Sequence, residues 1–495
     1  MKNRIWIFFL ALVATACKEN EKTVVDNSVD PMVYSMNNNA EIILENPEIN
    51  SISIGVYKDG QTYENYYGEI DDGKSNKPNE NSLFEIASVT KTFTAFLMAQ
   101  AVLDGKLSLG DDIRMYLEGS YPNLEYEGRP IQIKDLLTHT SGITRALSET
   151  LGKLFSPDAS DAERKAMDEY DTASLLADVA KFELDTIPGT RFDYSPMVGP
   201  EILAIILEKV YQKPYAELLK EHILVKADMN DTFLQVEGAN AKNMVNGYTD
   251  DGEFAPPVNI PLTGAGGGLK STVPDLLKYI RFLLESKDPV ISEMQKPLFF
   301  DEEDGDQYGY FWNLGEGEFM HSGGTRGTTN WLILSPQYNS GFTVIFNSNG
   351  KNSGRLINRI ANRILDDIEN YPKQNAYFVV RKAVLKDTEK GIEYYHQLKK
   401  DSLAHFDFDD DAMLNLVGYD LLRQDRTSEA IKIFQLLVSE FPDSANPYDS
   451  LGEAYFMNEA YDLALANYQK SYELNPENEN ALMMMERIEE AKKNQ

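Results

Sequence analysis

The sequence predicts an α+β domain followed by an all-α domain, and two observations lead to this prediction. Strand-like and helix-like segments mix from about residue 35 to 368, with strand signals at both ends of that stretch. From about residue 374 to 495 the strand signals disappear and a helical repeat takes their place. We therefore expect a sheet that pairs its N-terminal and C-terminal strands, covered by helices and joined to a helical repeat module.

Local patterns place individual elements in the first domain. Asp59-Gly60 separates two β-rich runs in SISIGVYKDGQTYENYYGEI, which indicates a hairpin. TKTFTAFLMAQAVLDGKL has helical apolar spacing and a stop at Gly105, and GPEILAIILEKVYQ predicts a second apolar helix. TNWLILSP and SGFTVIFNSN predict adjacent antiparallel strands.

The C-terminal region repeats itself. Four residues recur one tetratricopeptide period later, which indicates a helix pair per repeat: Gly418, Ala430, Phe434 and Pro442 return as Gly452, Ala464, Tyr468 and Pro476. The small residues let paired helices approach closely. Because about three units are usually needed, AYFVVRKAVLKDTEKGIEYYHQLKKD is a candidate first unit and NALMMMERIEEAKKN a capping helix. The run Met483–Met485 is assigned to the core or cap.

Composition limits the size and the partners of the chain. Its 495 residues are 42% hydrophobic and 25% charged, which suits a large globular domain plus a smaller one. The formal net charge of −32 repels phosphate backbones and anionic lipid. Nucleic-acid binding and membrane attachment by charge alone are therefore not expected.

The first 17 residues read as a targeting signal. Lys2 and Arg4 precede the apolar run IWIFFLALVA, which is too short for a lasting transmembrane helix. The run ends in ATAC, and its Cys17 is the only cysteine, so no intramolecular disulfide can form. This arrangement resembles a bacterial lipobox, although Ala14 stands where leucine is usual. The resemblance implies acylation of Cys17, a polar tether over 18–34 and anchoring at the cell envelope, facing the periplasm or the cell surface; an ordinary cleaved signal is the alternative.

The chemistry of the first domain centres on EIASVTKTFT, where Ser88 and Lys91 lie one helical turn apart. A lysine desolvated near a helix N-terminus has its charged form disfavoured, and it can then take the serine proton. The backbone N–H of Ser88 would serve as an oxyanion donor. A second Ser-x-x-Lys, Ser348 to Lys351 in SNGK, reads as a turn. The five histidines form no HExxH motif and there is no G-x-S-x-G elbow, so neither metal-dependent hydrolysis nor an α/β-hydrolase triad is expected. Acyl transfer from Ser88 would need no metal or organic cofactor.

The order of motifs resembles one family. SVTK is followed by LLTHTSGI, PGTRFDYSP, GAGGGLKSTVPDL and HSGGTRG. This order is similar to that of the β-lactamase-related serine hydrolases, which include class C β-lactamases, esterases and D-amino-acid peptidases with the penicillin-binding-protein fold. The resemblance implies an antiparallel sheet flanked by helices, with Ser88 as the acylated nucleophile, Lys91 as its partner and Tyr194 as the proton shuttle. HSG, with His321 and Gly323, occupies the place of the Lys-Thr-Gly motif, and the N–H of Gly324 that of the second oxyanion donor.

Two departures from the family pattern bear on substrate class. Pro196 replaces an asparagine that would hold a substrate amide, and His321 replaces a lysine that would pair with a substrate carboxylate. Both changes weaken the case for β-lactam hydrolysis and leave acyl transfer from Ser88 intact. His139 of LLTHTSGI is assigned a structural role.

The sequence therefore predicts a lipid-anchored serine hydrolase that acts through an acyl-enzyme on small ester or peptide-like substrates. Its repeat domain could bind a protein partner. One alternative is a catalytically weak hydrolase-fold scaffold whose repeat domain recruits that partner. A true β-lactamase is a further alternative.

Overall fold

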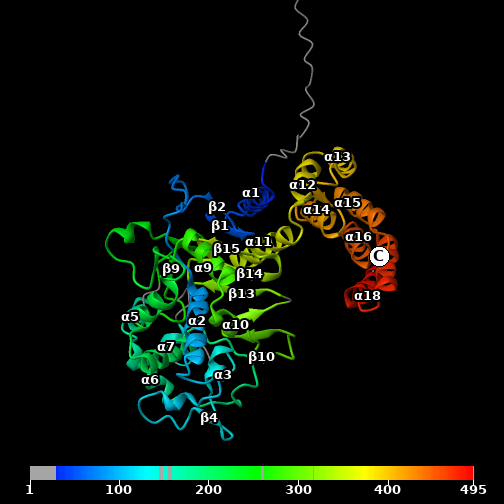
Figure 1. Cartoon of the computed structure of the whole chain (residues 1–495). Helices are drawn as coiled ribbons and strands as arrows, with labels where there is room; N and C mark the ends of the chain where they lie inside the picture. The colour runs from blue at the N-terminus through cyan, green and yellow to red at the C-terminus, as the bar shows by residue number, and fades with distance from the viewer. Residues whose placement is uncertain are drawn as a thin grey trace, which may run out of the picture.

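The computed structural model describes residues 29–143, 147, 149–153, 159–257, 261–315 and 317–493. An α+β domain built on one large sheet is followed by an arc of helices that ends at the C-terminus (Figure 1). The predicted signal with Cys17, and most of the predicted tether, lie outside the described residues. Residues 31–34 belong to helix α1 (Pro31–Ile43) and not to a tether, because Asp30 caps this helix by accepting a bond from the Met32 N–H at 2.8 Å.

The main sheet has eight antiparallel strands in the order β10-β11-β12-β13-β14-β15-β1-β2. N-terminal β1 pairs with C-terminal β15, which confirms the expected closure of the domain. The strands are β1 (Ser51–Lys58), β2 (Gln61–Gly68), β10 (Phe299–Phe300), β11 (Gln307–Gly309), β12 (Trp312–Leu314), β13 (Phe319–Gly324), β14 (Thr329–Ser335) and β15 (Ser340–Phe346).

The predicted hairpin joins β1 to β2. Lys58 pairs with Gln61, so the turn has two residues, and both Asp59 (φ 49°) and Gly60 (φ 88°) are left-handed, as a type I′ turn requires. The predicted pairing of β14 with β15 is also confirmed. These two hairpins supply four neighbouring strands of the sheet.

Helices cover both faces of the sheet (Figure 1). On one face, Ile52, Ile54 and Val56 of β1 share a core with α1 and α11 (Lys351–Glu369). On the other face, Gly55 meets α9 (Val273–Glu285), where an added Cβ would lie 2.7 Å from Val273 Cγ1. The strand is therefore buried on both sides along its whole length.

The two predicted apolar helices form the interior of the α+β domain. They are α2 (Thr90–Leu103), which ends before Gly105, and α7 (Val198–Tyr211). The remaining elements are β3 (Phe84–Glu85), η1 (Ala87–Val89), η2 (Ile113–Met115), β4 (Glu125–Tyr126), β5 (Arg129–Pro130), α3 (Ile133–Leu137), α4 (Glu149–Gly152), α5 (Asp161–Asp168), α6 (Thr172–Val179), α8 (Tyr215–Leu219), η3 (Lys220–Leu224), β6 (Thr232–Phe233), η4 (Gly238–Asn243), β7 (Gly247–Thr249), β8 (Phe254–Ala255), β9 (Lys270–Ser271), α10 (Pro289–Met294), η5 (Pro336–Tyr338) and β16 (Ser348–Asn349).

The C-terminal domain is all-α apart from two short strands. It contains β17 (Gln374–Asn375), α12 (Tyr377–Lys386), α13 (Thr388–Asp401), β18 (Phe406–Asp407), α14 (Ala412–Leu422), α15 (Thr427–Glu440), α16 (Ala445–Met457), α17 (Tyr461–Leu474) and α18 (Glu479–Lys493). Close helix approach depends on glycine, since an added Cβ at Gly418 would collide with the Phe434 ring and one at Gly452 would lie 3.0 Å from Tyr468 Cδ2.

The junction between the two domains is packed and charged. Ile42 of α1 belongs to the same apolar cluster as α12 and α14. Arg381 of α12 donates at 2.7 Å both to Glu45, just after α1, and to Asp420 of α14. Helix α1 therefore fastens the helical domain to the α+β domain. No helix among the described residues has both the length and the apolar character to cross a membrane.

Candidate active site

Ser88 and Lys91 meet as their spacing predicts. Ser88 lies in η1, directly before α2, and Lys91 lies in the first turn of α2. Ser88 Oγ receives a bond from Lys91 Nζ at 2.9 Å and a second from the hydroxyl of Tyr194 at 2.8 Å. Tyr194 comes from the irregular segment that leads into α7, so the site joins segments more than a hundred residues apart.

Lys91 is fully buried and held mainly by a backbone group. Its Nζ donates to the carbonyl of Gly266 at 2.6 Å and lies 5.3 Å from the centre of the Tyr194 ring. Burial lowers the pKa of Lys91, and the neighbouring Tyr194 and Glu201 offset only part of this effect. The buried amine therefore favours its neutral form more than an exposed lysine does, as a base next to a serine must.

Glu201 of α7 organises the loop that holds Lys91. Its buried carboxylate accepts bonds from the Thr263 N–H at 2.9 Å, from the Thr263 hydroxyl and from the Gly266 N–H at 3.4 Å. Burial raises the pKa of Glu201, and these donors counteract that effect. The carboxylate thus fixes the residue whose carbonyl binds Lys91. Glu201 was not predicted from the sequence, where its only signal is a single carboxylate within the apolar pattern of a helix.

The backbone around Ser88 is shaped by Ala87 and Gly323. Ala87 is left-handed, with φ 46°, a conformation that costs a non-glycine residue energy and that often occurs at functional sites. An added Cβ on Gly323 would lie 2.5 Å from the carbonyl oxygen of Ile86, so β13 approaches η1 only because this residue has no side chain. This approach brings Gly324, the next residue, to the wall of the cavities that contain Ser88.

His139 packs against Tyr194. The ring centres are 4.5 Å apart, and Phe311 and Phe192 approach the same imidazole at 5.1 and 6.0 Å. The Asp193 N–H donates to the His139 carbonyl at 2.7 Å. Burial lowers the pKa of His139 well below its usual value, so this imidazole is neutral. The structural role expected for His139 therefore includes support of Tyr194.

The residues predicted to bind substrate do not all reach the cavities. Pro196 and Gly324 line both cavities next to Ser88. His321 and Gly323 line neither of these two cavities, because their alternating positions in β13 turn them toward the interior. Burial and the nearby Lys91 lower the pKa of His321 to about 3, and its Nδ1–H donates to the Ser322 carbonyl at 2.7 Å. A buried, neutral His321 does not supply the charge of the lysine that it replaces.

The second Ser-x-x-Lys pair does not form a site. Ser348 is fully buried in β16, whereas Lys351 is exposed at the start of α11. Among the residues that the structure describes, no group of three or more His, Cys, Asp or Glu side chains could hold a metal ion.

The β-lactamase family model matches residues 37–366. The chain belongs to the β-lactamase family. This β-lactamase-family domain is 27% identical over 335 residues to protein flp of Staphylococcus aureus (strain MW2), covering 65% of this chain and 64% of that protein. It is also 26% identical over 282 residues to a β-lactamase of Pseudomonas fluorescens, covering 56% of this chain and 67% of that protein. The chain thus spans slightly less than two thirds of the staphylococcal relative's length.

Solved structures share the fold of this β-lactamase-family domain. A β-lactamase/D-alanine carboxypeptidase from Yersinia pestis superposes with a TM-score of 0.60 at 21% identity, over 68% of this chain and 99% of that one. An octameric penicillin-binding protein homologue from Pyrococcus abyssi gives 0.57 at 26% identity, over 71% and 82%. These matches confirm the predicted α+β fold, which the domain shares with solved β-lactamases and penicillin-binding protein homologues.

Proposed function

We propose that the protein hydrolyses ester or amide substrates through an acyl-enzyme on Ser88. The observation that carries this proposal is the convergence of two proton-handling groups on Ser88 Oγ, the Lys91 amine at 2.9 Å and the Tyr194 hydroxyl at 2.8 Å. A serine is a weak nucleophile until a neighbouring base removes its proton. Lys91 is buried and has a lowered pKa, so it meets that need.

The reaction has two steps. Lys91 Nζ accepts the Ser88 proton while Oγ bonds to the substrate carbonyl carbon, and the N–H groups of Ser88 and Gly324 hold the oxyanion. The bond from this carbon to the leaving group then breaks as Tyr194 donates its proton to the leaving oxygen or nitrogen, and Lys91 returns a proton to Tyr194. In the second step water replaces the leaving group, and the same transfers in reverse release a carboxylic acid and free Ser88.

A fluorophosphonate probe tests this proposal. We expect the wild type to be labelled and the Ser88→Ala variant to lose both labelling and ester turnover. Its melting temperature should change little, because one hydroxyl at a cavity wall adds little packing. The Ser348→Ala variant is the matched control and should keep both activities. Full ester turnover by Ser88→Ala would overturn the proposal.

Within this class we favour small esters over penicillins. A penicillin presents an amide and a carboxylate, whereas the site has Pro196 and a neutral, buried His321 at the positions that would bind them. The missing charge-assisted bond to the carboxylate alone is worth about 1.5–3 kcal/mol, or roughly ten- to a hundredfold in binding. We expect kcat/KM for a small uncharged ester to exceed that for a penicillin. Comparable values for the two substrates would exclude this preference.

Two further assignments rest on the sequence. We propose that Cys17 is acylated, so that the protein is anchored at the cell envelope, because the cysteine lies three residues after the end of a signal-like apolar run. The test is metabolic labelling with a radioactive fatty acid, which Cys17→Ala should abolish.

We also propose that the C-terminal helix pairs are tetratricopeptide repeats that bind a protein partner. This is supported by Gly418 and Gly452, which lie at equivalent close helix–helix contacts in successive pairs. A scaffold with an unreactive Ser88 remains the second candidate, and the probe distinguishes it.

A further inference from the structure

Two cavities meet at Ser88. One has a volume of about 780 Å³ and extends toward α8, η3 and β6. The other, of about 720 Å³, is an open groove between β13 and the start of α11. Ser88, Pro196, Gly324 and Thr325 line both, so a substrate held at Ser88 can extend into each.

The position of Tyr194 distinguishes the two ends of a substrate. In the proposed reaction Tyr194 gives its proton to the leaving group, so the leaving group must lie beside its hydroxyl. Tyr194 lines the groove and does not line the larger cavity. The leaving group therefore occupies the groove, and the acyl group is directed into the larger cavity.

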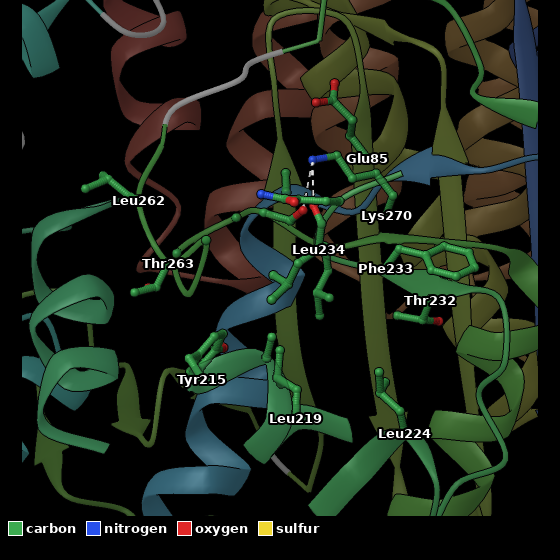
Figure 2. A pocket seen from close by; sticks show the side chains of 18 of the residues that line it. Glu85, Tyr215, Leu219, Leu224, Thr232, Phe233, Leu234, Leu262, Thr263 and Lys270 are labelled. Atoms are coloured by element: carbon green, nitrogen blue, oxygen red, sulfur yellow. Dashed lines mark hydrogen bonds between the residues drawn. The ribbon is translucent and has the colours of Figure 1, made fainter. Parts of the chain in front are cut away.

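One part of the wall of the larger cavity suits an apolar chain, whereas the charged Glu85, Glu208 and Lys220 line other parts of it. Leu219, Leu224 and Leu234 lie around it, with the Leu234 side chain above the other two (Figure 2). Two polar side chains in the same wall already have partners, because the Tyr215 hydroxyl bonds Thr94 at 2.6 Å and the Thr232 hydroxyl bonds Ser271 at 2.8 Å. None of the buried, unpartnered polar side-chain atoms among the described residues lies in this wall.

Lys270 does not turn this cavity into a site for anions. Its Nζ donates to the Gly268 carbonyl at 2.9 Å and to the Leu234 carbonyl at 3.4 Å (Figure 2). Its cation is therefore occupied by backbone groups of the wall. Gly266, Gly267 and Gly268 also line this cavity and add no side chains to it.

The groove has a larger share of charged side chains in its wall. Asp250, Asp251 and Glu253 line it together with Arg326 and Lys351, and Asp250 already accepts the Asn352 N–H at the start of α11 at 2.7 Å. A leaving group with hydroxyl or amine groups would find hydrogen-bonding partners there, whereas an aliphatic one would displace water from charged groups at a cost.

We propose that the larger cavity is an acyl-chain pocket and that the natural substrate joins a medium-length aliphatic acyl group to a polar leaving group. This proposal rests on the proposed function, since it takes Ser88 as the acylated residue and Tyr194 as the proton donor. Its volume lies within the usual range of about 300–1,000 Å³ for small-molecule pockets.

A chain-length series tests the pocket. With p-nitrophenyl acetate, butyrate and hexanoate, we expect wild-type kcat/KM to rise at least tenfold from acetate to hexanoate. A tenfold rise is a conservative expectation, because burying each CH₂ fully improves binding about fourfold. A flat or falling series would overturn the proposal. The proposed function would survive that result if Ser88→Ala still lost acetate hydrolysis and probe labelling.

A pocket-filling variant locates the chain. Leu234→Trp should lower the ratio of hexanoate to acetate kcat/KM at least tenfold, whereas Leu234→Ala should keep or extend the preference for long chains. Leu103→Trp is the matched control, since Leu103 is 44% exposed on α2 and lines neither cavity. A ratio in Leu234→Trp equal to that of the control would contradict the assignment.

The orientation of the substrate has its own test. Methyl octanoate carries its chain on the acyl side and octyl acetate on the alcohol side, and acid release by the wild type can be titrated for both. We expect kcat/KM for methyl octanoate to be at least tenfold higher. Faster hydrolysis of octyl acetate would place the chain in the groove and overturn the proposal.

Discussion

Lys91 combines the chemistry of the site with a cost in stability. Its amine is fully buried, and its bonds go to a hydroxyl and to a carbonyl rather than to a carboxylate. A group of this kind is charged in the unfolded chain and disfavours charge in the folded one. The same burial that suits Lys91 to its proposed role as the base therefore opposes folding at neutral pH.

The stability of the protein should consequently report on Lys91. Because the folded pKa of Lys91 lies below its unfolded value of about 10.4, the unfolded state binds more protons between the two, and stability rises with pH in that window. Compared with Lys91→Met, the wild type should gain up to about 1.4 kcal/mol per pH unit as pH approaches 10. Denaturant unfolding of both proteins at several pH values measures this. Parallel pH profiles would mean that Lys91 keeps its ordinary pKa in the fold.

His139 is expected to act through Tyr194. Its ring lies against the Tyr194 ring, and its carbonyl accepts the Asp193 N–H. His139→Ala would leave space beside Tyr194, and a displaced proton donor could lower kcat by about ten- to a hundredfold. We expect the fall in kcat to be larger than the change in KM. Asparagine tolerates the left-handed backbone of φ 56° at this position, so His139→Asn should regain more of the wild-type stability than of the wild-type activity. A wild-type kcat in His139→Ala would limit His139 to packing.

Strand β13 and the segment around η1 depend on each other. The strand supplies Gly324 to the site only because Gly323 lets it approach the Ile86 carbonyl. Helix α7 contributes from the other side, since its Glu201 fixes the loop whose Gly266 carbonyl binds Lys91. Four segments thus position one serine, and each contact is made by backbone or by a buried side chain.

A single methyl group on β13 should therefore damage catalysis. In Gly323→Ala the new Cβ would lie 2.5 Å from a backbone oxygen, so the strand or η1 must move. We expect ester kcat/KM to fall about a hundredfold, as the loss of one oxyanion donor does. Gly354→Ala is the matched control, because an added Cβ there has no neighbour within 4 Å. Equal activity of the two variants would show that the approach of β13 is not needed.

Some of these elements and contacts could be predicted from the sequence, and others could not. The hairpin at Asp59-Gly60, helices α2 and α7 and the pairing of β14 with β15 follow from local patterns, because turn chemistry and apolar spacing are local properties. Lys91 could be matched to Ser88 for the same reason, since the two lie one turn apart. The Gly266 carbonyl lies 175 positions from Lys91, and no periodicity predicts that contact. Likewise, the inward direction of His321 depends on which face of β13 is buried.

The two domains are packed together at their junction, but the Ser88 site lies in only one of them. Arg381 bonds Glu45 and Asp420 across the junction, and Ile42 joins the apolar cluster of the helical domain. The Ser88 site lies wholly within the α+β domain. Activity should therefore tolerate damage inside the helical domain that leaves α1 in place.

Gly418→Val tests this independence. The added side chain would collide with the Phe434 ring between α14 and α15, and overpacking of this kind costs about 1–3 kcal/mol. We expect a lower melting temperature for the helical domain and an ester kcat/KM within twofold of the wild type. Gly354→Ala again serves as the control. A large loss of turnover at temperatures where Gly418→Val is folded would show that the helical domain supports the site.

The acyl-enzyme itself can be observed by intact-mass spectrometry after rapid acid quenching of the protein with a p-nitrophenyl ester. We expect one added acyl mass, located by peptide mapping to Ser88, in the wild type and a longer-lived adduct when Tyr194 is changed to Phe. Lys91→Arg should form no adduct on this timescale, because arginine stays protonated and cannot act as the base. An adduct that forms at the wild-type rate in Lys91→Arg, or one that maps to a residue other than Ser88, would contradict the Ser-Lys mechanism.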